Sequence, residues 1–281
     1  MAAVQYVTRV IGVLVALQAT SGAVPAYQVV WNAPSQVCEK CGGLPLDNYG
    51  IEANKNEAHI GGTIAYFNCS SFGLWPKLNA TITEMPCWDA QPRSPCSWTP
   101  WGSIEVLQNG GVPQAANLTL HLEKVAADIQ RQLPDREYAG IIILDVESWR
   151  PVLWANFNAM SFNVVFSERL IQKKHPGWNA SQVSEVAAIH FNKAALAFFI
   201  ETIRTIRALR PKAKIGYYGW PDLVTTEGTP TNVDDDLKDM YREIDVMAPS
   251  VYPLFDASRQ ANYTGEKILQ VRRIQCNSMF L

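Results

Sequence analysis

The feature that most constrains the fold of this chain is the alternation of short β-rich runs with longer segments of helical periodicity. Apolar residues recur at helical spacing over residues 118–133, and Pro134 ends this run. The continuously apolar run 140–144 follows after the short connection 135–139. Consecutive parallel strands need long crossover connections, so this order is typical of parallel α/β architecture. We therefore expect an α/β fold, built as a (β/α) barrel or as a doubly wound sheet.

Further runs extend this pattern along the chain. A long helix is predicted over residues 181–209, before Pro211, and an irregular excursion over residues 70–111, which are rich in Pro, Trp, Cys and Gly. No Gly-x-Gly-x-x-Gly motif or Walker-type Gly-Lys-Thr follows a strand, so we predict no nucleotide cofactor and prefer the barrel. Four more strands are predicted at residues 27–31, 62–67, 214–218 and 244–251.

The N-terminal segment has the pattern of a secretory signal peptide. Arg9 precedes an apolar run from Val10 to Ala19, and small residues follow as far as Ala23. This run is too short to span a bilayer, and we predict no later membrane span. We expect residues 1–23 to be removed and residues 24–281 to form one domain, secreted or delivered to a lumenal or lysosomal compartment.

Other features agree with passage through the secretory pathway. The six cysteines indicate disulfides, whose pairing the sequence leaves open. Cys38 and Cys41 have dithiol spacing, but no second pair stands at zinc spacing, so we expect no metal site. Asn-x-Ser/Thr triplets, the acceptors for N-glycosylation, begin at Asn68, Asn79, Asn117, Asn179 and Asn262.

Composition narrows the class of partner. The net charge of −2 argues against a general nucleic-acid binder or a protein that binds anionic membranes, both of which need a basic surplus. Nine Trp and ten Tyr residues suit carbohydrate binding, because flat rings stack on sugar faces. The same rings also suit an ordinary core, so composition leaves both interpretations open.

The strongest chemical signal is the pair Asp145 and Glu147 at the end of the apolar run 140–144. Side chains alternate along a strand, so we expect both carboxylates on one face, at the carboxyl end where barrels carry active sites. Two neighbouring carboxylates repel, and one should keep its proton to higher pH, as acid-assisted cleavage of a glycosidic bond requires. A solvated strand end, or an Asp that caps a helix, explains the spacing equally well.

The segment from Asp145 to Pro151, Asp-Val-Glu-Ser-Trp-Arg-Pro, resembles the catalytic signature of the hyaluronidases, glycoside hydrolases of venoms, lysosomes and sperm. The resemblance implies a distorted barrel like that of triosephosphate isomerase, with a long substrate groove. It extends from Tyr27 to Tyr252. Further similar segments follow in the family's order at residues 30–38, 110–114, 175–178, 209–211, 216–222 and 249–252.

The resemblance also implies a reaction, the retaining endo-hydrolysis of hyaluronan, and often chondroitin, at the N-acetylhexosaminide bond. Glu147 is the implied acid/base, and Asp145 the implied partner of the substrate's acetamido group, whose oxygen is the nucleophile. The implied partner is a glycosaminoglycan polymer, and no cofactor is needed. The sequence leaves two roles open for the Arg150 guanidinium: it binds the polymer's carboxylates, or it forms an ion pair within the protein. The implied substrate-binding residues are Tyr218, Tyr252, Tyr66, Trp149 and Arg150.

The similarity fades after Tyr252. We therefore expect the barrel to be incomplete, without the family's closing strands and its cysteine-rich C-terminal module. Two alternative functions stay open: a catalytically impaired glycan-binding protein of the same fold, and a chitinase-like hydrolase, which shares Asp-x-Glu on a barrel strand.

Overall fold

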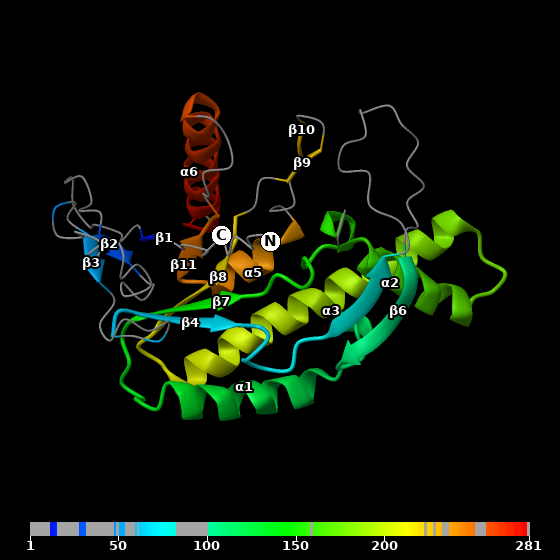
Figure 1. Cartoon of the computed structure of the whole chain (residues 1–281), viewed down its shortest axis with the longest axis horizontal. Helices are drawn as coiled ribbons and strands as arrows, with labels where there is room; N and C mark the ends of the chain where they lie inside the picture. The colour runs from blue at the N-terminus through cyan, green and yellow to red at the C-terminus, as the bar shows by residue number, and fades with distance from the viewer. Residues whose placement is uncertain are drawn as a thin grey trace, which may run out of the picture.

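A four-stranded parallel sheet, in the order β11-β8-β7-β4, forms the centre of the molecule (Figure 1). Its strands are β4 (Ile64–Asn68), β7 (Ile141–Asp145), β8 (Lys214–Tyr218) and β11 (Val246–Ala248). They confirm four of the predicted strands. The computed structural model describes residues 12–15, 28–31, 48, 51–53, 60, 62–82, 101–157, 160–221, 224–226, 229–231, 236–250 and 257–279.

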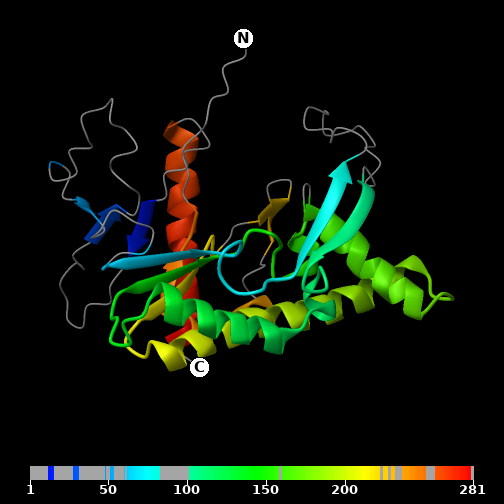
Figure 2. The same ribbon diagram turned by 60° about the horizontal axis from the view of Figure 1, so that its bottom comes forward.

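Two long helices, α1 (Leu118–Gln132) and α3 (Ala180–Leu209), lie together along one face of this sheet (Figures 1 and 2). They confirm both predicted helices. Asn179 begins α3 with a capping box, in which its side chain and that of Gln182 bond to each other's backbone N–H. Ile142 and Leu144 of β7 point to the helices and join the main core with Ile129, Phe199 and Ile203.

The opposite face of the sheet carries a second, smaller apolar cluster. Ile141 and Ile143 of β7 belong to it, so the predicted alternation of side chains along this strand is confirmed. Gly216 of β8 lies on this face, where a Cβ atom would meet the carbonyl oxygen of Val246 at 2.1 Å. A side chain at this position would therefore push β11 away from β8.

The predicted α/β class is confirmed, and the described residues make an open sheet with no closed barrel among them. The predicted strand at 27–31 exists as β2 (Gln28–Trp31), but it pairs with β1 (Gly12–Val15) and β3 (Ile51–Ala53) in a separate sheet. β1 lies within the predicted signal peptide. The rest of that segment lies outside the described residues, and its cleavage stays a prediction.

The prediction of an irregular excursion over residues 70–111 is wrong for much of that region. β5 (Lys77–Ile82) and β6 (Trp101–Gln108) form an antiparallel pair. The Pro- and Cys-rich residues lie mainly between these strands, at 83–100, outside the described residues. The prediction failed because the Pro- and Cys-rich composition of residues 83–100 was taken to describe the flanking segments as well, and these form β5 and β6.

Several elements were not predicted. α2 (Phe162–Lys174) packs against α3, and α5 (Lys238–Glu243) packs against both α3 and α6 (Ala257–Met279). Single 3₁₀ turns precede α1 and α2. The remaining elements are η3 (Pro113–Ala115), η4 (Leu153–Ala155), and the antiparallel pair β9 (Val224–Thr226) and β10 (Thr229–Thr231).

The prediction that no later segment is apolar and long enough for a membrane span needs correction at α3. Among the described residues, this helix alone meets that test by length and composition. One stripe of its apolar side chains, Phe191, Phe198 and Phe199 among them, is buried in the main core, whereas Ile189 is exposed. Packing against the sheet and α1 therefore accounts for the apolar character of α3.

Candidate active site

Three polar side chains stand on one face of the sheet, at the carboxyl ends of neighbouring strands. Asn68 on β4 pairs in register with Asp145 on β7. Ile143, two residues before Asp145, pairs with Gly216, two residues before Tyr218 on β8. Residues two apart share a face of a strand. The sheet therefore brings Asn68, Asp145 and Tyr218 together at the end where (β/α) folds carry their active sites.

Asp145 is the buried centre of this group, with only 3% of its surface exposed. Its Oδ2 accepts hydrogen bonds from the hydroxyl of Tyr66 and from Nδ2 of Asn68, the latter at 2.8 Å. Its Oδ1 is also buried, yet it has no hydrogen-bond partner among the described residues. A buried carboxylate oxygen without a donor is costly, so this atom is suited to accept a hydrogen bond from a ligand.

Tyr66 serves this site as a hydrogen-bond donor. Burial raises the pKa of its phenol far above the ordinary value, and the hydrogen bond to Asp145 raises it further. The charge of Glu147 adds to the same shift. The phenol therefore stays protonated at physiological pH, and both carboxylates lie close enough to act on it.

Glu147 lies beyond the strand and is exposed, whereas Asp145 is buried. The prediction that both carboxylates stand on one strand is therefore wrong for Glu147, because β7 ends at Asp145. The last residue of β7 paired with β4 is Asp145, and the last paired with β8 is Leu144. The two carboxylates differ in environment, one desolvated and the other in water.

The hydroxyl of Tyr218 donates to Oγ of Ser250, just beyond β11, at 3.2 Å. Sequence reasoning did not single out Ser250, although it belongs to a segment that resembles the family, residues 249–252. The same segment contains Tyr252, which was predicted to bind substrate and which lies outside the described residues.

Trp149 does not join the site, so its predicted contact with substrate is corrected. The side chain is 1% exposed, and its ring packs edge-on against Phe191 and Phe199 in the main core. Its Nε1 donates to the carbonyl oxygen of Pro76 at 2.9 Å. The chain turns after Val146, and this turn sends the ring into the core.

Arg150 is half-buried, with its guanidinium carbon 5.8 Å from the ring centroid of Trp220. Its contact with a polymer stays a prediction. Asn156, which sequence reasoning missed, orders this loop. The Nδ2 of Asn156 donates to the carbonyls of Arg150, Val152 and Leu153, and its Oδ1 accepts from the backbone N–H of Arg150. An isolated loop Asn carries no periodic signal that would have revealed this role.

The predicted glycosylation sites fall into two groups. Asn79, Asn117, Asn179 and Asn262 are exposed. Asn117 and Asn179 cap helices through Oδ1, which leaves Nδ2, the atom that carries a glycan, out of the cap. Asn68 is half-buried, and its Nδ2 donates to Asp145.

Cys69 carries a free thiol, so the structure does not support the predicted disulfide for this residue. The side chains of the other five cysteines lie outside the described residues, and their pairing stays a prediction.

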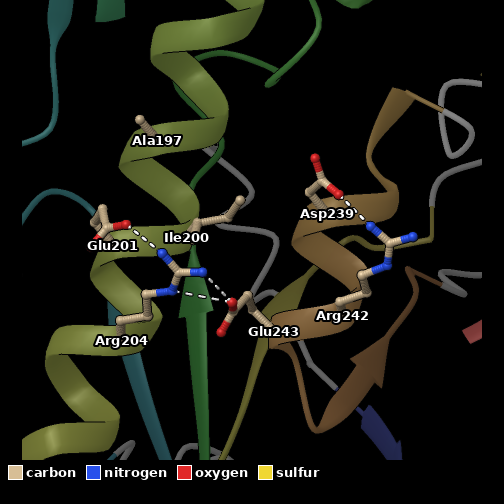
Figure 3. Close-up of a pocket in the computed structure, with 7 residues that line it drawn as sticks. All are labelled: Ala197, Ile200, Glu201, Arg204, Asp239, Arg242 and Glu243. Carbon is tan, nitrogen blue, oxygen red and sulfur yellow. Dashed lines mark hydrogen bonds and ion pairs between the residues drawn. The ribbon is translucent and has the colours of Figure 1, made fainter. Parts of the chain in front are cut away.

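A separate hollow of about 400 Å³ lies between α3 and α5 (Figure 3). Its charged side chains neutralise one another. Arg204 pairs with Glu201 and Glu243, and Arg242 pairs with Asp239. This hollow holds neither predicted catalytic carboxylate, and its charges are already matched.

Comparisons with known proteins indicate which family this chain resembles. Residues 100–234 match the hyaluronidase model of glycoside hydrolase family 56. A chondroitin hydrolase of Caenorhabditis elegans is 30% identical over 263 residues, which are 89% of this chain and 53% of that protein. Hyaluronidase B of Vespa velutina is 30% identical over 80% of this chain and 65% of its own length. The chain thus spans between about half and two thirds of these relatives.

A solved structure of bee venom hyaluronidase in complex with a hyaluronic acid tetramer is also similar. Its TM-score is 0.70 at 27% identity, over 87% of this chain and 74% of the venom chain. This similarity confirms the predicted class, an α/β fold like the triosephosphate isomerase barrel.

Proposed function

Because this chain belongs to the hyaluronidase family of glycoside hydrolases, we propose that it hydrolyses N-acetylhexosaminide bonds in a glycosaminoglycan, hyaluronan or chondroitin. One observation carries the proposal. Asp145 is buried with two donors on Oδ2 and no partner on Oδ1 among the described residues, beside the exposed Glu147. This geometry offers one fixed acceptor for a substrate amide and one solvated carboxyl group for proton transfer.

In the proposed reaction, Glu147 donates its proton to the glycosidic oxygen as the bond to the anomeric carbon breaks. The acetamido oxygen of the same sugar attacks that carbon, and positive charge develops on the acetamido group. Oδ1 of Asp145 accepts the acetamido N–H and stabilises this charge. Water then adds to the anomeric carbon, gives a proton to Glu147 and releases the acetamido group, so the configuration is retained.

Two further parts of the proposal concern the surroundings of the enzyme. The steps above need only this chain's residues, the substrate's own acetamido group and water, with no metal or organic cofactor. The N-terminal signal pattern and the similarity to bee venom hyaluronidase support a secreted or lumenal protein.

The test is to incubate the protein with hyaluronan, chondroitin, chondroitin sulfates and chitin, and to count new reducing ends. Glu147→Gln should lower kcat by at least about 10²-fold, because it removes the transferable proton. The matched control is Glu123→Gln, the same change at an exposed position on α1, which should be silent.

Each outcome has a different meaning. Full activity of Glu147→Gln would exclude the proposed acid. Saturable binding of hyaluronan without shortening would favour a glycan-binding protein, and cleavage of chitin alone a chitinase-like hydrolase.

A further inference from the structure

Asn68 has two competing roles, because it begins an Asn-x-Ser triplet and also lies beside Asp145. Both ends of its side-chain amide are engaged. Oδ1 accepts the backbone N–H of Ser70 at 2.9 Å, and Nδ2 donates to Oδ2 of Asp145 at 2.8 Å. The side chain therefore joins the turn after β4 to the carboxylate at the end of β7.

The chemistry of these partners fixes the orientation of the amide. A backbone N–H can only donate, so the atom that faces Ser70 must be the oxygen. Nδ2 then necessarily faces Asp145. A further bond, from the backbone N–H of Cys69 to the carbonyl oxygen of Asp145 at 2.9 Å, holds the two strand ends in register.

Nδ2 is also the atom to which an N-linked glycan would be attached. At Asn68 this atom is 2.8 Å from Asp145, in a half-buried position on the face that carries the site. The other triplets begin at exposed asparagines. A glycan on Asn68 would stand over Asp145, where the substrate's acetamido group has to bind.

We propose that Asn68 is the positioning residue of Asp145 and stays unglycosylated in the active protein. The inference rests on the proposed function, since it assigns Asn68 a part in the same site. With Tyr66, Asn68 places two donors on Oδ2, which fixes the carboxylate and leaves Oδ1 for the substrate. Neither donor uses Oδ1, so the orientation of Asp145 is set before substrate binds.

The test uses three variants that all destroy the triplet. Ser70→Ala keeps the amide of Asn68 and the backbone N–H that orients it. Asn68→Ala removes both hydrogen bonds. Asn68→Asp keeps an acceptor for Ser70 but replaces the donor with a second carboxylate beside Asp145, near Glu147, Tyr66 and Tyr218.

Ser70→Ala should have the kcat, KM and pH profile of the wild type. Asn68→Ala should lose about 10- to 100-fold in kcat, the loss expected for one hydrogen bond to a charged group. Asn68→Asp should be weaker still at neutral pH and should recover as the pH falls, because a protonated carboxyl group can donate again. A residue that only holds the turn would tolerate Asn68→Asp and show no such recovery.

Peptide mapping of the secreted wild-type protein, before and after enzymatic removal of glycans, gives an activity-independent readout. We expect Asn68 to be unmodified. A glycan on Asn68 in active protein, wild-type kcat in Asn68→Ala, or an equal loss in Ser70→Ala would each overturn the proposal. If the wild type cleaves no polymer, the proposed function fails separately. The variants are then compared by their affinity for a hyaluronan oligosaccharide, with the same order expected.

Discussion

Two buried polar groups in this molecule, His121 in the main core and Asp145 at the carboxyl end of β7, differ in how completely they are hydrogen-bonded. Nδ1 of His121 accepts from the backbone N–H of Leu74 at 3.0 Å, and Nε2 lies 2.8 Å from Oγ1 of Thr202. That hydroxyl donates to the carbonyl of Phe198, so Nε2 is the protonated nitrogen of the ring. Every polar atom of His121 has a partner.

Asp145 has both its donors on one oxygen and none, among the described residues, on the other. The difference separates a structural role from a functional one. A fully bonded buried group stabilises the fold, whereas an incompletely bonded one leaves a position that a ligand can fill. The following substitutions test this distinction.

The largest effect should come from Asp145→Asn. In the proposed reaction, the variant loses the negative charge that stabilises the positive charge on the acetamido group, so kcat should fall by about 10²- to 10³-fold. The free energy of unfolding, from urea titration, should change by less than about 1 kcal/mol, since the substitution is nearly isosteric. A large loss of stability with little loss of kcat would give Asp145 the structural role instead.

The next effect is the pH dependence that His121 imposes on stability. Burial lowers the pKa of His121 from 6.5 to about 4. Between these values the unfolded chain binds a proton that the folded chain does not, so lowering the pH favours unfolding. Stability present above pH 6.5 should fall by about 3 kcal/mol on approaching pH 4. Urea titrations of the wild type and of His121→Leu at several pH values give the free energy of unfolding of each. The wild type should lose more stability at low pH than the variant, and an equal pH dependence in the two would contradict the prediction.

Trp149→Phe should cost about 2 kcal/mol of stability, because the ring shrinks and the carbonyl of Pro76 loses its donor. KM for the polymer should not change, since the ring is buried in the core. A rise in KM without loss of stability would restore Trp149 to the substrate groove.

The smallest effect should come from Thr202→Val, which removes the hydroxyl partner of His121 but keeps the bond from Leu74. We expect about 1 kcal/mol of destabilisation and unchanged kcat per folded molecule. A marked loss of kcat would show that the core network reaches the active site.

The sequence predicted the parts of the fold that depend on local pattern. β7 was recognisable because a strand buried on both faces is almost continuously apolar, and α1 and α3 because each buries one stripe. The pairing of β5 with β6 could not be predicted, since the composition between them obscured both strands.

The site was predictable only in part. Asp145 and Glu147 stand out in the sequence. The donors to Asp145 do not, because Tyr66 and Asn68 precede it by 79 and 77 positions in the sequence. Asn68 was assigned to glycosylation because its triplet is local, whereas its bond to Asp145 depends on the pairing of β4 with β7. The alternation rule also failed beyond Asp145, where Trp149 enters the core.

Glu147 lies on a short arch between two anchors. Asp145 on one side is fixed in the sheet, and Trp149 on the other is fixed in the core by its bond to Pro76. Val146 is buried as well. The backbone of Glu147 therefore has little room to move, although its side chain is in water. The position of this proposed acid is therefore set by its neighbours on both sides, Asp145 in the sheet and Trp149 in the core, and not by a strand of its own.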